Sequence, residues 1–80
     1  MRAYVLVEAA VGKAKVVYDT VRQLQIPEAQ IVSADVVTGP FDVIVLIEAE
    51  DLDRLGWAVS ERIQRAEGVQ RTTTCLLLSL

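Results

Sequence analysis

The stretch DVIVLIEA, residues 42–49, decides the fold of this chain. Side chains of a β-strand alternate between the two sides of a sheet, so Val43 and Val45 point one way while Ile44 and Leu46 point the other. Both sides of this strand are therefore apolar. A sheet with one side in water shows alternating apolar and polar residues instead. The pattern predicts a strand that must be covered on both faces.

Four segments of the chain are predicted strands, and two are predicted helices. The strands are expected at residues 3–9, 30–38, 42–49 and 71–80. Apolar residues at helical spacing predict one helix over residues 12–24 and a second that is capped by Asp51 and ends at Gly68. The sequence Thr-Gly-Pro at residues 38–40 predicts a reversal of the chain between the second and third strands.

The order strand-helix-strand-strand-helix-strand is typical of the α+β ferredoxin-like fold, with a four-stranded antiparallel sheet. Right-handed crossovers place both helices on the same face of that sheet. The other face is also apolar, and a second copy of the chain is its simplest cover. We therefore predict that residues 1–80 form one domain, and that two copies form a homodimer through their sheet faces.

Apolar residues of the second predicted helix form a core stripe: Leu52, Leu55, Val59, Ile63 and Ala66. In the last predicted strand, Leu76, Leu78 and Leu80 are expected to share one face. Trp57 lies about 160° around the helix from the mean direction of the stripe, so we expect it to point outward. There it either packs on Arg62 or a loop, or contacts a second dimer, because tryptophan is a common interface anchor.

Composition narrows the possible functions. The chain has 80 residues, a net charge of −3 and a pI of about 4.7, which argues against binding to nucleic acid. Its longest aliphatic runs, residues 43–47 and 76–78, are far shorter than the roughly 20 residues that span a membrane. The sequence begins without a secretory signal pattern, and we expect a cytoplasmic protein.

Few residues are suited to catalysis or metal binding. The chain has no histidine and a single cysteine, Cys75, which excludes an internal disulfide and a zinc or Cys/His site. Nucleophile motifs and phosphate-binding glycine loops are absent. The acidic pairs Glu48 and Glu50, and Asp51 and Asp53, fall at the ends of predicted elements, where solvation and helix capping explain them. We expect no catalytic residue, no metal and no cofactor.

The turn at residues 38–42 is the strongest candidate for a binding site. Free backbone N–H groups and a hydroxyl there can hold an α-carboxylate, and Asp42 can accept a hydrogen bond from an α-ammonium. Alternatively, Asp42 caps the turn and Phe41 fills the edge of the core. Thr72 and Thr74 share a strand face and can add hydroxyl ligands, or they can reflect ordinary strand propensity.

Four segments of the chain form a recognisable set: AYVLVE (3–8), TGPFDVIV (38–45), EAEDL (48–52) and GVQRTTT (68–74). Together they resemble the effector-binding domain of the Lrp/AsnC (feast/famine) transcriptional regulators. The resemblance covers the whole chain and implies a ferredoxin-like fold, dimers formed through the sheets, and further assembly, often into octamers. It also implies binding of free amino acids or related small molecules at contacts between dimers.

The family's motifs correspond to six candidate ligand-binding residues: Thr38, Gly39, Phe41, Asp42, Thr72 and Thr74. Two features depart from the family. Pro40 removes one backbone donor from the turn, and Gln-Ile-Pro at residues 25–27 replaces the glycine-valine often seen after the first helix. The DNA-binding domain of the regulators has no counterpart, so the chain resembles the stand-alone form of the domain.

The resemblance implies a non-enzymatic amino-acid-binding and oligomerisation module linked to transcriptional regulation, acting without direct DNA contact. A full-length Lrp/AsnC regulator is a candidate partner. One alternative is a small dimeric α+β barrel enzyme of the oxygenase or isomerase type, which shares the fold and the pairing of sheets. The absence of histidine and the short aliphatic strands count against it. A purely structural oligomer, or an ACT-like module detached from its enzyme, is the other alternative.

Overall fold

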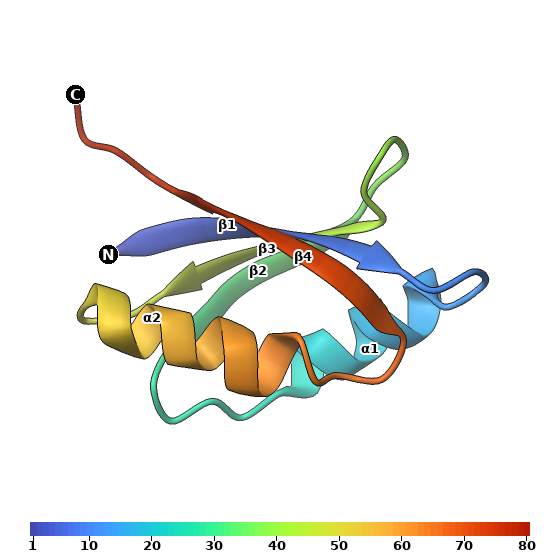
Figure 1. The fold of residues 1–80 in the computed structure, drawn as a ribbon, viewed down its shortest axis with the longest axis horizontal. Helices are drawn as coiled ribbons and strands as arrows, with labels where there is room; N and C mark the ends of the chain where they lie inside the picture. Colours follow the sequence, from blue (N-terminus) through green and yellow to red (C-terminus); the bar gives the residue numbers. More distant parts are fainter.

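The computed structural model describes all 80 residues, and its elements follow the predicted order (Figure 1). In chain order they are β1 (Arg2–Ala9), α1 (Ala14–Gln23), β2 (Gln30–Val36), β3 (Val43–Glu48), α2 (Leu52–Ala58), η1 (Val59–Ile63) and β4 (Val69–Leu76). The element η1 is a π-helical turn that continues α2. None of the helices has the length and apolar character needed to cross a membrane.

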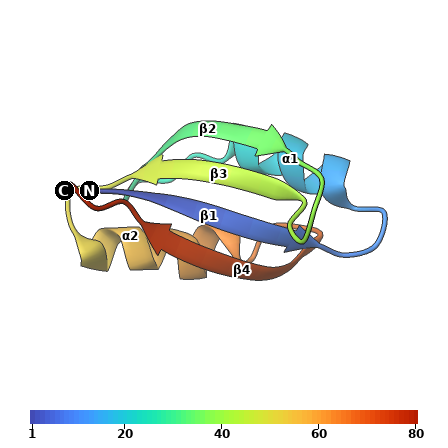
Figure 2. The ribbon, with the colours of Figure 1, turned by 90° about the horizontal axis from the view of Figure 1, so that it is seen from above.

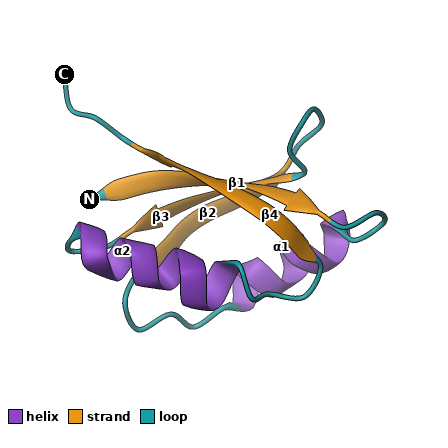
Figure 3. Ribbon diagram, in the orientation of Figure 1, coloured by secondary structure: helices purple, strands orange, loops and turns teal.

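The four strands form one antiparallel sheet in the order β2-β3-β1-β4 (Figure 2). Both helices lie against the same face of this sheet (Figure 3). The prediction of an α+β ferredoxin-like fold is confirmed. The first strand of the chain is a central strand of the sheet, because β1 pairs with β3 on one side and with the last strand, β4, on the other.

The hydrophobic core lies between the sheet and the helices. The central strands contribute fully buried side chains: Val5, Val7, Val43, Val45 and Ile47. The helices contribute a second buried set: Val17, Val21, Leu55, Val59 and Ile63. Burying one such aliphatic side chain stabilises a fold by roughly 1.5–3 kcal/mol, so this layer holds the helices to the sheet.

The second helix buries most of its predicted stripe, but Leu52 is 53% exposed. Leu55, Val59 and Ile63 repeat at four-residue steps, each of which passes a full α-helical turn by about 40°. The wider turn η1 absorbs this drift, since the N–H of Gln64 donates to the Val59 carbonyl five residues back at 2.8 Å. Leu52 lies about 60° from Leu55 on the same side as Val59, so its exposure comes from its place as the first residue of α2 and not from its direction around the helix.

The second face of the sheet, called the outer face below, has no helix over it (Figure 1). The strand register pairs Tyr4 with Leu46 and with Cys75, and Leu6 with Ile44, so these side chains point to the outer face. None of them is fully buried, and Tyr4 is 43% exposed. The predicted uncovered apolar face is therefore present in the single chain. The second copy that covers it stays a prediction.

The fourth strand starts earlier and ends earlier than predicted. It spans Val69–Leu76 rather than residues 71–80, so Leu78 and Leu80 lie beyond the strand and the shared face predicted for them is wrong. The reason is the length of the neighbouring strand. The N–H of Leu77 donates to the carbonyl of Arg2 at 3.0 Å, and Arg2 is the first residue of β1, so later residues have no strand beside them.

Candidate functional site

The turn between β2 and β3 is closed by one backbone hydrogen bond and reversed at a glycine. The N–H of Val37 donates to the carbonyl of Asp42 at 2.9 Å. Gly39 has a φ of +130°, a conformation that residues with a Cβ rarely adopt. Pro40 follows it with a fixed φ and no N–H. The predicted reversal of the chain at this turn is therefore present.

Asp42 anchors the turn to the end of β1 by two hydrogen bonds. Its backbone N–H donates to the carbonyl of Val7 at 2.8 Å. Its Oδ2 accepts the N–H of Ala9, also at 2.8 Å. The Asp42 side chain therefore ties the turn to β1, and it accepts no hydrogen bond from within the turn itself. The other carboxylate oxygen, Oδ1, has no hydrogen-bond partner within the chain and stays available.

Three backbone donors of the turn are free. The N–H groups of Thr38, Gly39 and Phe41 donate to no backbone or side-chain acceptor. Thr38 and Gly39 are exposed, whereas Phe41 is half-buried but is not among the residues that pack against the core, so its expected place at the core edge stays a prediction. The turn is thus fixed at its base and carries unpaired donors at its tip. Such a set of amides suits an anion.

Thr72 lies across β1 from this turn, and Thr74 lies farther along β4. Thr72 pairs with Val7, the residue that accepts the Asp42 N–H, so the two candidate residues reach the end of β1 from opposite sides. The hydroxyl of Thr72 already accepts a hydrogen bond from Nε2 of Gln64 at 2.9 Å. The sequence did not predict a role for Gln64, because no local pattern indicates its contact with β4. Thr74 is exposed and sits further along β4, where it pairs with Val5.

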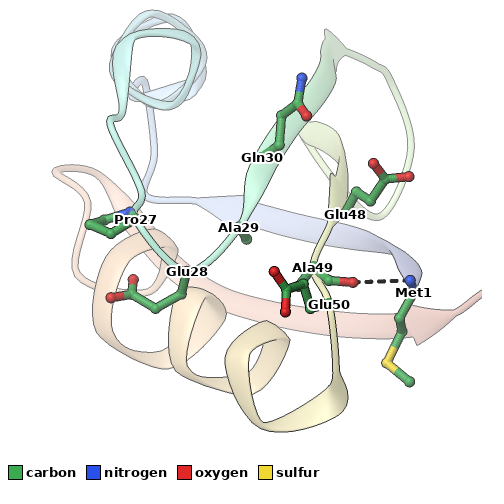
Figure 4. Close-up of a pocket in the computed structure, with 8 residues that line it drawn as sticks. All are labelled: Met1, Pro27, Glu28, Ala29, Gln30, Glu48, Ala49 and Glu50. Carbon is green, nitrogen blue, oxygen red and sulfur yellow. Dashed lines mark hydrogen bonds between the residues drawn. The ribbon is translucent and has the colours of Figure 1, made fainter.

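The candidate residues form an open surface, since both depressions of the single chain lie elsewhere. The first, of about 410 Å³, is found at the opposite end of β1 and β3 (Figure 4). Its lining residues are Met1, Pro27, Glu28, Ala29, Gln30, Glu48, Ala49 and Glu50. The ammonium of Met1 donates to the Ala49 carbonyl there at 3.0 Å. Its carboxylates do not gather closely enough to form a metal site.

The second depression, of about 430 Å³, adjoins the first at Glu28 and is bordered by Trp57. Trp57 is 51% exposed, so the predicted outward direction is confirmed. One oxygen of Glu28, Oε1, is buried without a hydrogen bond, and Nε of Arg62 lies 3.7 Å from it. A contact of Trp57 with a second dimer stays a prediction.

Two carboxyl groups near these depressions have lowered pKa values. A hydrogen bond from Arg2 Nε at 2.8 Å, reinforced by the positive charge, lowers the pKa of Glu48. The backbone N–H of Arg54 donates to Asp51 Oδ1 at 2.8 Å and is the main cause of the lowered pKa of Asp51. Both shifts come from neighbours in the same chain. They reflect strand pairing for Glu48 and the predicted helix cap for Asp51.

A four-stranded antiparallel sheet with two helices on one face defines the class of the fold: a small α+β domain of the ferredoxin-like type. The chain belongs to the Lrp/AsnC ligand binding domain family, which matches residues 2–80. The resemblance stated from the sequence is therefore confirmed. This family membership assigns a regulatory, effector-binding role to the domain. Among curated proteins, none matches the chain.

Solved structures share this fold. TTHA0845 from Thermus thermophilus is 28% identical with a TM-score of 0.84, covering 99% of this chain and 94% of its own. The hypothetical protein PHS023 from Pyrococcus horikoshii is 30% identical with a TM-score of 0.78, covering 98% of this chain and 90% of its own. The transcriptional regulator NMB0573 from Neisseria meningitidis, solved in complex with L-Met, is 21% identical with a TM-score of 0.80. That match covers 98% of this chain and 49% of the regulator, and it shows the fold alone.

Proposed function

We propose that residues 1–80 act as a non-enzymatic effector-binding and oligomerisation domain in transcriptional regulation, and that the effector is a free amino acid or a related small molecule. One observation carries this proposal. The three unpaired N–H groups at the tip of the turn 38–42 are held beside a carboxylate by the hydrogen bonds of Asp42. Membership of a ligand-binding family supports the role of effector binding in general.

The groups of the turn complement a zwitterion. The N–H groups of Thr38, Gly39 and Phe41 donate to the α-carboxylate of the effector, and the Thr38 hydroxyl can add a fourth bond. The free Oδ1 of Asp42 accepts from the α-ammonium. Thr72 and Thr74 supply further hydroxyl groups from β4. No metal or cofactor takes part in this binding.

The Neisseria regulator supports an amino acid as the ligand class, because its structure holds L-Met. Its sequence identity to this chain is too low to transfer the side-chain preference. The open turn leaves room for groups from a neighbouring chain to contact the effector's side chain. Specificity for one amino acid therefore depends on the assembled form rather than on the turn alone.

Assembly is the second half of the proposal. Two copies pack through their outer faces into a homodimer, which buries the apolar side chains left uncovered in the single chain. Dimers then associate further, up to an octamer, so that the turn of one dimer meets the next. An effector that binds the assembled form preferentially shifts the equilibrium toward it.

The domain acts through protein contacts rather than through DNA. Its net charge of −3 disfavours contact with phosphates, so regulation runs through co-assembly with a full-length Lrp/AsnC regulator. In this proposal the protein acts in the cytoplasm together with that regulator.

Native mass spectrometry tests this function. The purified protein is measured alone and with each common amino acid at millimolar concentration. We expect dimer multiples such as octamers that gain mass or stability with one class of amino acid. A plain dimer that ignores every amino acid contradicts the proposal and favours the small dimeric barrel enzyme or the structural oligomer.

A matched pair of variants tests the site. Asp42→Asn keeps an oxygen for the Ala9 N–H but removes the charge that holds the ammonium, so we expect amino-acid affinity to fall by about tenfold or more by calorimetry. Asp53→Asn is the control, since Asp53 is exposed and lies in α2, away from the turn. Equal affinity of the two variants removes Asp42 from the site.

A further inference from the structure

Residues 77–80 form an apolar segment, here called the leucine arm, that leaves the sheet. Leu77 makes the last hydrogen bond to β1, through its N–H to the carbonyl of Arg2. Beyond it the chain rises on the side of the sheet opposite the helices, above the start of β1 (Figures 1 and 2). Leu77 is 42% exposed, Leu78 is 79% exposed, and Leu80 is fully exposed. The single chain therefore leaves Leu78 and Leu80 largely uncovered, whereas Leu77 is more than half covered.

The leucine arm and the outer face are placed so that one and the same partner molecule can cover both. The arm rises from the rim of the outer face, so any molecule packed on that face meets it (Figure 1). Both surfaces are apolar, and both gain by leaving water. Because one chain carries the apolar face and the apolar arm, two copies can exchange these contacts about a two-fold axis.

Charge complementarity favours a second copy as that occupant. Arg2 and Glu48 pair across β1 and β3 with 2.8 Å between Nε and Oε2. Glu8 and Arg71 pair across β1 and β4 at 3.8 Å. The charges at the two ends of the outer face are therefore paired within one chain. When the outer face of a second copy approaches, no unpaired like charges meet at these two ends, although the chain has a net charge of −3. Asp35, on the edge strand β2, pairs with Ile44, so it also points to the outer face and has no ion pair within the chain.

We infer that the leucine arm is a strap that packs on the outer face of the partner copy. This inference rests on the sheet-to-sheet dimer proposed above and adds a segment to it. Each arm contacts the partner near residues 4–6 and 44–46, where the outer face is most apolar. The strap extends the buried area beyond the sheets and fixes which way the two sheets lie on each other.

Sedimentation equilibrium of matched variants tests the strap. The double variant Leu78→Asp/Leu80→Asp puts charge on the arm, and we expect its dimer dissociation constant to rise about tenfold or more. Val11→Asp, at a fully exposed apolar position in the turn before α1, is the control and keeps the wild-type constant. Leu46→Asp, on the outer face, dissociates the dimer whether or not the arm matters.

The outcomes separate the two ideas. In one outcome Leu46→Asp dissociates the dimer, whereas the arm variant has the same dissociation constant as Val11→Asp. This result supports the sheet-to-sheet dimer and contradicts the strap. A wild-type protein that is monomeric at all concentrations overturns the sheet dimer and the strap together. Loss of affinity in both the arm and face variants, with the control unchanged, supports both.

Crosslinking locates the arm directly. In a Cys75→Ser background, Leu80→Cys is labelled with a benzophenone maleimide, and unlabelled and ¹⁵N-labelled chains are mixed by unfolding and refolding. We expect crosslinked peptides that join one isotope to the other and map to residues 4–6 or 44–46. Crosslinks found only within one isotope place the arm on its own chain and overturn the inference.

Discussion

At the scale of single residues, Asp42 combines support of the fold with availability for a ligand. One carboxylate oxygen accepts the N–H of Ala9, 33 residues away in the sequence, and the other is free. The sequence presented these roles as alternatives, because no local pattern reveals which distant donor a carboxylate meets. In the structure one oxygen of Asp42 is engaged by the fold, and the other has no partner in the chain.

Replacing Asp42 separates these roles through stability. We expect Asp42→Ala to lower the free energy of unfolding by about 1–3 kcal/mol, because the partly buried Ala9 N–H loses its acceptor. Asp42→Asn retains an oxygen and is expected to lose less. Urea unfolding at one fixed protein concentration measures both. Equal losses for the two variants would show that charge, rather than the hydrogen bond, stabilises the turn.

Gly68 is a second residue whose position requires a particular side chain, in this case none. It has a φ of +87°, and a Cβ there would lie 3.0 Å from Cβ of Lys13 and 3.1 Å from Cγ2 of Val17. We expect Gly68→Ala to cost about 2–5 kcal/mol, the sum of a left-handed backbone and overpacking. Gly12→Ala is the control, with a φ of +76° and open space, and is expected to cost about 1–2 kcal/mol. Thermal unfolding of the two variants measures how much more stability Gly68→Ala loses than Gly12→Ala, and this difference is the steric contribution. Equal losses of stability would show that there is no steric contribution.

At the scale of elements, the apolar period predicted all four strands and both helices, but it did not predict how they end. Strand β4 ends where β1 begins, and the turn η1 compensates the four-residue spacing of the core stripe. These features depend on partners distant in sequence. The turn 38–42 was predictable because its residues are continuous in the sequence. The hydrogen bond of Gln64 with Thr72 was not predictable, because it joins the end of η1 to a different element, β4.

The cap of α2 makes stability depend on pH. The pKa of Asp51 is lower in the fold than its ordinary value of 3.8, so its charge stabilises the fold above that value. This contribution is lost as pH falls through the lowered, folded pKa. Asp51→Asn keeps a good capping side chain that does not titrate. We expect urea unfolding to show wild type and variant close together at pH 7, and a steeper loss for wild type between roughly pH 5 and pH 2. Parallel curves would contradict this.

At the scale of the whole molecule, the main feature is the outer face of the sheet, which no helix of the chain covers. The sequence predicted that it would be apolar and uncovered, because alternation within a strand is a local property. It could not predict that the charges at its two ends pair within the chain, since Arg2 with Glu48 and Glu8 with Arg71 join residues far apart. This pairing makes the face self-compatible despite the acidic composition.

Salt dependence checks that view of the dimer. We expect the dimer dissociation constant to stay level or fall as salt rises from about 0.1 M to about 1 M, because salt screens the repulsion between two acidic chains and strengthens apolar burial. Sedimentation equilibrium at both concentrations measures it. A rise of tenfold would instead reveal ion pairs between the chains and contradict a self-neutralised face.

The central position of β1 also bears on how the chain is made. Ribosomes add roughly 5–20 residues per second from the N-terminus, so β1 emerges several seconds before its second neighbour, β4. During that interval one edge of an apolar strand has no partner. A newly made chain therefore exposes an unpaired, aggregation-prone edge of β1 until β4 has emerged and joined the sheet.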